Sequence, residues 1–221
     1  MKKISTLMLA VILTAGLAGP ASADLIITGV IDGPLTGGTP KAVELYALNN
    51  IADLSSYGIG SANNGGGSDG EEFTLSGSAT AGDYIYIATE STEFNNFFGF
   101  APDLTSGTAV NVNGNDAIEL FESGVVVDVF GDIDTDGTGE PWEYLDGWAY
   151  RVDETGPDGS TFNISNWTFS GINALDGVTS NATATSAFPI GTFTPTSIPE
   201  PSSIALLGLL GLAGVVVRRR S

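Results

Sequence analysis

Apolar and polar positions alternate over short stretches of this 221-residue chain, and a period of two is typical of strands with one buried face. Residues 42–48 show the pattern, with Val43 and Leu45 on one face and Glu44 and Tyr46 on the other. Other short runs rich in β-branched and aromatic residues predict strands by the same reasoning. These runs are residues 25–31, 73–75, 84–88, 117–121 and 125–130.

Turn residues separate these predicted strands. Residues 122–124, Glu-Ser-Gly, lie between two of them and indicate a tight hairpin, because Gly adopts positive φ at little cost. Residues 63–67 read NNGGG and predict a loop. No stretch of the body sustains a helical period over three turns, and only residues 92–98 predict one short helix. Strands and turns at this spacing favour an all-β sandwich or barrel.

Two alternatives stay open for residues 178–198, which follow the predicted sandwich. The segment is rich in Thr, Ser and Ala, which favours a flexible linker that carries O-linked sugar. Phe188, Ile190 and Phe193 interrupt that composition and favour a last strand that packs on the body.

The first 23 residues have the three parts of a secretory signal peptide. Two lysines precede an apolar run over residues 4–19, and Ala21 and Ala23 form a small-residue cleavage site. We expect cleavage before Asp24, which leaves an exported body that begins at that residue. The alternative is an uncleaved N-terminal membrane anchor.

The other end of the chain combines a helix-breaking motif, an uncharged run and a cluster of arginines. The parts are Pro199, Glu200 and Pro201, then residues 202–217, then Arg218, Arg219 and Arg220. As a helix the uncharged run is roughly 24 Å long, short for a hydrocarbon core of about 30 Å. Terminal arginines hold the cytoplasmic side of such a segment. An ordinary single-pass anchor is one interpretation.

This order of parts resembles the PEP-CTERM sorting signal of Gram-negative bacteria, and the resemblance covers residues 199–221. It implies that an exosortase, a membrane enzyme, processes the exported chain. The C-terminal run then serves as a transmembrane sorting helix in an inner-membrane intermediate. The mature protein is expected at the cell surface or in the extracellular matrix, without Arg218, Arg219 and Arg220.

The body between the two terminal segments is strongly acidic. Residues 24–198 hold 25 of the 26 acidic residues and only two basic ones, Lys41 and Arg151, so their net charge is −23. Such a charge repels phosphate backbones and disfavours direct nucleic-acid binding without divalent ions. The chain has no Cys and no His, which excludes disulfides and Ser-His-Asp or Cys-His catalysis. No motif selects an acid–base pair among the carboxylates, so we expect no enzymatic activity.

The body also resembles a bacterial lamin tail domain, through many short matches spread over residues 25–195. The matching segments are residues 25–31, 43–49, 53–59, 82–88, 115–120, 127–131 and the sequence WEYLDGWAYR at 142–151. The resemblance implies an immunoglobulin-like β-sandwich over residues 24–177. In bacteria such domains are often joined to secreted nucleases, whose catalytic module this chain lacks.

One acidic segment has the spacing of a calcium loop. Asp132, Asp134 and Asp136 alternate before a glycine, and Glu143 stands at the twelfth position, as in the loop of an EF-hand. An EF-hand also needs flanking helices, whereas a predicted strand precedes this loop and Pro141 lies inside it. The loop is therefore either a strand-flanked Ca²⁺ site or a solvated acidic turn.

Aromatic residues follow the acidic loop. Exposed, Trp142 and Trp148 would form a platform for sugar rings or bases; buried beside glycines, they would close one end of the sandwich. The burial of these Trp side chains is the favoured interpretation. Nearby, Arg151 is expected to pair with a carboxylate such as Asp128 or Asp153.

These observations predict an exported, non-enzymatic β-sandwich with a binding or structural role, in which Ca²⁺ is a candidate stabiliser. Extracellular polysaccharide is a candidate partner. Two alternatives follow from the same residues: a carbohydrate- or polymer-binding module, and an accessory of extracellular nucleic-acid metabolism.

Overall fold

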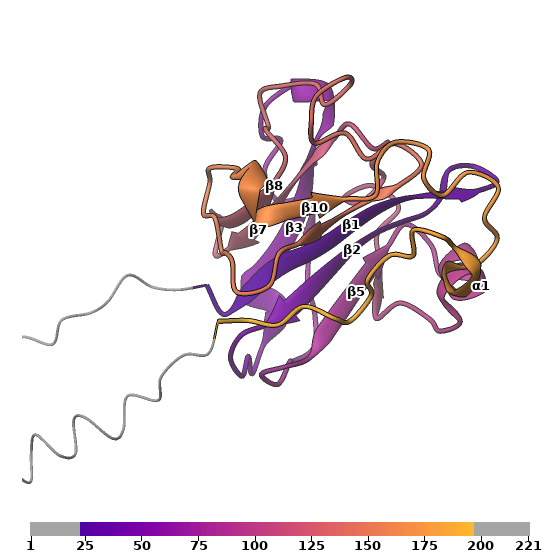
Figure 1. Cartoon of the computed structure of the whole chain (residues 1–221). Coiled ribbons are helices and arrows are strands. Elements are labelled where there is room, and N and C mark those ends of the chain that lie inside the picture. The colour runs from indigo at the N-terminus through magenta and orange to yellow at the C-terminus, as the bar shows by residue number, and fades with distance from the viewer. Residues whose placement is uncertain (1–22, 197–221) are drawn as a thin grey trace, which may run out of the picture.

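Two β-sheets pack face to face in the computed structural model, which describes residues 23–196 (Figure 1). The predicted signal peptide and sorting helix fall outside these residues, apart from Ala23. The larger sheet has the order β10-β9-β1-β2-β5-β6. Its strands are β1 Leu25–Leu35, β2 Thr39–Ala47, β5 Tyr84–Ala88, β6 Leu104–Thr105, β9 Trp148–Arg151 and β10 Trp167–Phe169.

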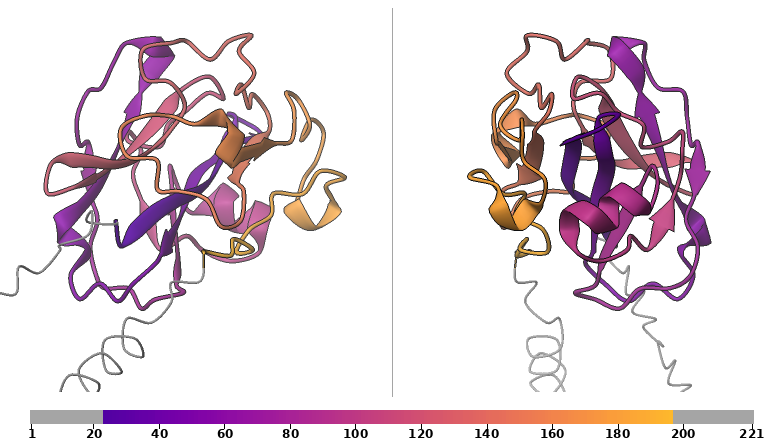
Figure 2. Two further views of the ribbon diagram at one scale, coloured as in Figure 1. Left: turned by 60° about the vertical axis from the view of Figure 1, so that its left-hand side comes forward. Right: turned by 90° about the vertical axis from the view of Figure 1, so that its right-hand side faces the viewer.

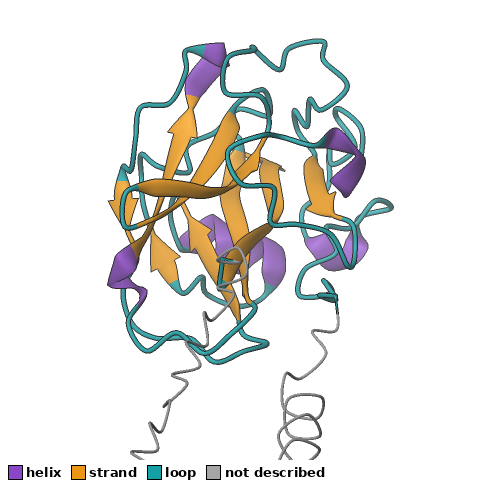
Figure 3. Ribbon diagram, turned by 90° about the vertical axis from the view of Figure 1, so that its left-hand side faces the viewer, coloured by secondary structure: helices purple, strands orange, loops and turns teal. Residues whose placement is uncertain are grey.

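The smaller sheet has the order β4-β3-β7-β8. Its strands are β3 Tyr57–Ala62, β4 Phe73–Thr74, β7 Ala117–Glu122 and β8 Val125–Phe130. All neighbouring strands in both sheets are antiparallel except β5 and β6, which are parallel. The arrangement agrees with the predicted all-β sandwich (Figure 3).

Local sequence explains the hairpin between β7 and β8. Only Ser123 and Gly124 connect the strands, with φ values of 52° and 78°. Two left-handed residues in a two-residue loop match the right-handed twist of the flanking strands. The predicted hairpin is therefore confirmed.

A bulge at Thr28 controls which side chains of β1 point into the sandwich. The pairing of β1 with β2 shifts register between Ile27 and Gly29. Because side chains alternate along a strand, the extra residue reverses the faces that follow it. Ile27 and Val30 therefore both lie in the core between the sheets, whereas Ile31 faces the opposite side.

The outer face of the larger sheet is also covered, by helix α1, Thr92–Phe98, and by the last part of the body (Figure 2). Phe94 and Phe97 of the helix and Phe188 and Phe193 of the C-terminal part are buried there. Burial on both faces explains why β1 is apolar along most of its length. The helix was predicted with the same bounds.

Residues 178–196 adopt neither of the two predicted states. No strand is assigned between those residues, which contain one 3₁₀ turn at Asn181–Thr183. They nevertheless pack on the sandwich through buried aromatic side chains. Among residues 23–196, no helix combines the length and apolar character needed to cross a bilayer.

Candidate functional site

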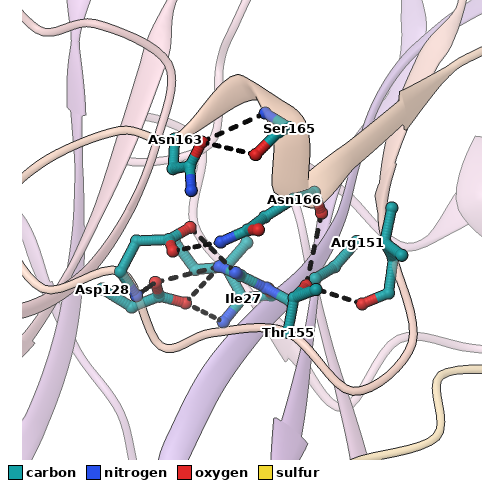
Figure 4. Close-up of polar contacts among 9 residues, drawn as sticks. Ile27, Asp128, Arg151, Thr155, Asn163, Ser165 and Asn166 are labelled. Carbon is teal, nitrogen blue, oxygen red and sulfur yellow. Dashed lines mark hydrogen bonds and ion pairs between the residues drawn. The ribbon is translucent and has the colours of Figure 1, made fainter.

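Arg151 lies at the end of β9 and joins the two sheets (Figure 4). Its Nη2 donates to both oxygens of Asp128 on β8, at 2.7 and 2.9 Å, and its Nε donates to the carbonyl of Ile27 on β1 at 2.6 Å. Nη1 donates to Asp158 at 3.0 Å, and the guanidinium lies 4.5 Å from the centre of the Trp167 ring. The predicted pairing with Asp128 is confirmed.

Both oxygens of the Asp128 carboxylate accept hydrogen bonds. It accepts hydrogen bonds from the backbone N–H groups of Ile27 and Asp158, each at 2.8 Å, in addition to Arg151. Burial raises the pKa of Asp128, and the charge of Arg151 and these backbone donors act against that rise. Since both side chains are fully buried and belong to strands of different sheets, this ion pair is a structural connection between the sheets.

A second buried acid, Glu44 on β2, organises the outer face of the larger sheet. Its side chain accepts hydrogen bonds from the hydroxyls of Thr28 and Tyr150 and from the N–H of Gly191, each at 2.7 Å. Glu44 is 1% exposed and belongs to none of the ion pairs found among residues 23–196. Burial is the main cause that raises the pKa of Glu44, and these hydrogen bonds oppose it.

The same network fastens residues 186–196, which we call the C-terminal strap. The Tyr150 hydroxyl accepts from the N–H groups of Thr192 and Phe193, at 3.1 and 3.0 Å. Further bonds run along the strap, from Tyr84 Oη to the Phe193 carbonyl at 2.7 Å and from Trp148 Nε1 to the Ser186 carbonyl at 2.9 Å. The strap is therefore an integral part of the folded body.

The sequence did not predict this role for Glu44, which was placed only on the face of its strand opposite Val43 and Leu45. The signal was present in the phenylalanines of the Thr-rich tail, since Phe188 and Phe193 are among the apolar side chains that cover this face. What could not be inferred is which strand they cover, because that depends on the path of the chain.

Three of the four carboxylates of the predicted calcium loop accept hydrogen bonds from the backbone of the loop itself. Asp132 accepts from the N–H of Asp134 at 3.0 Å, and Asp136 accepts from the N–H of Thr138 at 3.0 Å. Glu143 accepts from the N–H of Gly139 at 2.7 Å. Within residues 23–196, no three acidic side chains come together as a metal site. As folded, the loop does not gather its carboxylates into a calcium cage, one of the two alternatives that its spacing left open, because Asp132, Asp136 and Glu143 each cap a turn.

The two tryptophans proposed as a platform are buried. Trp142 is 4% exposed and packs edge-on against Phe130, and Trp148 is 8% exposed beside Phe188. Trp142 belongs to the core between the sheets and Trp148 to the outer-face core. The exposed-platform alternative is therefore wrong for these side chains, and the favoured alternative, burial, is correct.

Two of the pockets on the described surface are lined by polar side chains. One, of about 370 Å³, is lined by hydroxyl and carboxylate side chains with one tyrosine, namely Ser76, Ser78, Asp83, Asp103 and Tyr84, among others. The other, of about 250 Å³, lies beside the acidic loop, where Asp132, Asp134, Ser160 and Thr161 contribute to its wall. Both offer hydrogen-bond acceptors and hydroxyls, and neither contains a basic side chain.

Removing Arg151 tests the connection between the sheets. We expect Arg151→Met to lower the free energy of unfolding by about 3–5 kcal/mol, because Asp128 then stays buried without a counter-charge. Denaturant unfolding measures the change. The double variant Arg151→Met/Asp128→Leu should recover stability relative to the single one. A single variant as stable as the wild type would contradict the structural role of the pair.

The raised pKa of Glu44 predicts a pH dependence of stability. A carboxyl whose pKa is higher in the folded state stabilises the fold below its unfolded pKa of about 4.3. That contribution is lost as the pH rises through the folded-state pKa. Stability of the wild type relative to Glu44→Gln should therefore fall as the pH is raised above this value.

Thermal unfolding from about pH 3 to about pH 8, on both sides of the unfolded-state pKa, measures this difference in stability. Glu140→Gln, at an exposed position, controls for the loss of one negative charge. A difference between wild type and Glu44→Gln that stays constant with pH, or grows in favour of the wild type, would contradict the prediction.

Comparison with known proteins finds one match, and it lies outside the described residues. Residues 197–220 match the PEP-CTERM protein-sorting motif, which contains the predicted signal residues Pro199, Glu200, Pro201 and Arg218, Arg219, Arg220. No curated protein and no solved structure matches the chain. The motif implies export, processing by an exosortase and sorting to the surface.

Proposed function

We propose that this chain is an exported, exosortase-processed β-sandwich that acts outside the cell as a structural or binding component and not as an enzyme. The sorting-motif match at residues 197–220 carries the proposal. It assigns a destination to the chain, and the body supplies a stable fold to be delivered there. We further propose a Gram-negative host and removal of the arginine cluster from the mature protein.

Hydrogen bonds at the end of the strap support separate roles for the folded body and the sorting motif. The hydroxyl of Thr196 donates to the carbonyl of Glu154 at 2.9 Å, and the N–H of Glu154 donates to the carbonyl of Thr194 at 2.8 Å. Thr196, the last residue that the structure describes, is therefore bonded to the body and directly followed by the matched segment, which begins at residue 197. Processing after that point leaves these contacts of the body intact.

The use of charged groups in the body supports a non-enzymatic role. Both cations of the body, Lys41 and Arg151, are at most 6% exposed and are bonded to buried carboxylates. Glu44, Asp128 and Tyr150 take part in hydrogen bonds that hold strands and strap together. The chain contains no His and no Cys to serve as a base or nucleophile.

We also propose that the body is a lamin-tail-like, immunoglobulin-like sandwich. Its two mainly antiparallel sheets, with a core shared between them, support this assignment. Five of the segments that carry the resemblance, residues 25–31, 43–49, 82–88, 115–120 and 127–131, overlap strands β1, β2, β5, β7 and β8.

The proposal is tested by following the full chain in a host that has an exosortase. Antibodies against the body and against the C-terminal tail report its fractionation and processing. We expect the wild type to lose the tail and leave the membrane fraction, and the Pro199→Ala/Glu200→Ala variant to keep the tail there. Pro195→Ala, at a proline two residues before the matched segment and four before Pro199, is the matched control and should behave as the wild type.

An exosortase-deleted host should retain the wild-type tail in the membrane fraction as well. Equal processing of the wild type and the Pro199→Ala/Glu200→Ala variant, or equal processing with and without the exosortase, would contradict the proposal.

A further inference from the structure

Lys41, the second buried cation of the body, contacts both a carboxylate and a side-chain amide. Its Nζ donates to Asp32 Oδ1 at 2.7 Å and to Asn113 Oδ1 at 3.0 Å, and it also donates to the carbonyl of Val112. Lys41 is 6% exposed and Asp32 is 2% exposed. The amine and the proton carrier are thus buried together, and the carboxamide of Asn113 contacts the amine from the surface.

The three groups come from different parts of the fold. Lys41 is on β2 and Asp32 is on β1, both in the larger sheet, whereas Asn113 lies just before β7 of the smaller sheet. A nucleophile held against an electrophile in this way reacts as in an intramolecular step, for which effective molarities reach about 10⁵–10⁸ M. The fold therefore supplies the fixed contact between amine and carboxamide that free lysine and asparagine in water lack.

The surroundings of Asp32 suit it to exchange a proton with the amine. Burial, the largest cause, raises the pKa of its carboxyl, and the hydrogen bond and charge of Lys41 oppose that rise. The other neighbours are acidic or neutral: Asp146, whose N–H lies 3.4 Å from Asp32 Oδ2, and the buried phenol of Tyr144. Lowering the charge of the amine is how a buried lysine becomes a nucleophile.

We propose that Lys41 and Asn113 form an intramolecular isopeptide bond, with Asp32 as the proton carrier. Asp32 takes a proton from the Lys41 ammonium, and the freed lone pair of Nζ attacks Cγ of Asn113. The Nζ–Cγ bond forms and the Cγ–Nδ2 bond breaks. Asp32 delivers its proton to the departing nitrogen, and the proton released by Nζ leaves with it, so that one ammonium ion is the only by-product. No atom is oxidised or reduced.

The bond explains how a chain without cysteine can be reinforced outside the cell. Disulfides stabilise exported proteins by closing loops in the unfolded chain, and this chain has none. A link from residue 41 to residue 113 would close a long loop and join the larger sheet covalently to the segment that leads into the smaller one. Asn113 is exposed at the surface, which gives the ammonia a path to solvent.

A competing reaction at the same asparagine gives the same change in mass. Asn113 precedes Gly114, and an Asn-Gly pair can close on its own backbone to a succinimide, also with loss of ammonia. The two products differ at Lys41, because only the isopeptide bond consumes the ε-amine. Trypsin cuts after lysine only when that amine is free, so the digest separates them.

The test uses the full chain, purified, denatured and digested with trypsin, followed by mass spectrometry. For the wild type we expect no cleavage after Lys41 and a peptide that runs through to Arg151, lighter than its sequence by one ammonia. Fragmentation should locate the link at residues 41 and 113. Cleavage after Lys41 at full mass would show an ion pair only, and cleavage with loss of ammonia would show a succinimide; either result overturns the proposal.

Variants of the same loop complete the test. Asn113→Ala, a change at an exposed residue that leaves the Lys41–Asp32 pair in place, should restore cleavage after Lys41 and the full mass. Asn111→Ala, also exposed, is the matched control and should stay linked. Persistent protection of Lys41 in Asn113→Ala would overturn the proposal. Asp32→Asn should leave Lys41 cleavable, and complete linkage in that variant would remove the proton-carrier role.

Discussion

The larger sheet has to be buried on both of its faces, and most features of this protein follow from that constraint. One face of β1 and β2 packs against the smaller sheet, and the other packs against α1 and the C-terminal strap. Apolar burial of this kind contributes roughly 25 cal/mol per Å² removed from water. The bulge at Thr28 lets a single strand serve both faces, because it changes which side chains point inward.

Burial on both faces also traps charged groups that an exposed sheet would leave in water. Asp32, Glu44 and Arg151 are each 2% exposed or less, and a buried charge is costly without partners. Arg151 is compensated by Asp128 across the sheets, Glu44 by hydroxyls and a strap amide, and Asp32 by Lys41. The buried ion pairs and hydrogen bonds of the body therefore stabilise the packing of the two sheets and the strap.

The sequence predicted those elements whose signal is local. Helix α1 and strands β5 and β8 have the predicted bounds, because periodicity and turn residues specify them. Strand β9 was not among the predicted strands, because its pairing with β1 joins segments that are far apart in the sequence. The acidic loop matched a calcium pattern by spacing alone, whereas in the fold Asp132, Asp136 and Glu143 accept hydrogen bonds from the backbone of the loop. The burial of Glu44 required knowledge of where the strap lies.

Native-state hydrogen exchange of the strap tests the central claim most directly. If the outer face of the larger sheet must be covered, the amides of Gly191 and Phe193 should be protected together with those of β1 and exchange through the same global opening. This outcome would show that the strap is part of the cooperative fold up to the sorting motif. Exchange of both strap amides at the rate of an unstructured chain, while β1 stays protected, would contradict the account.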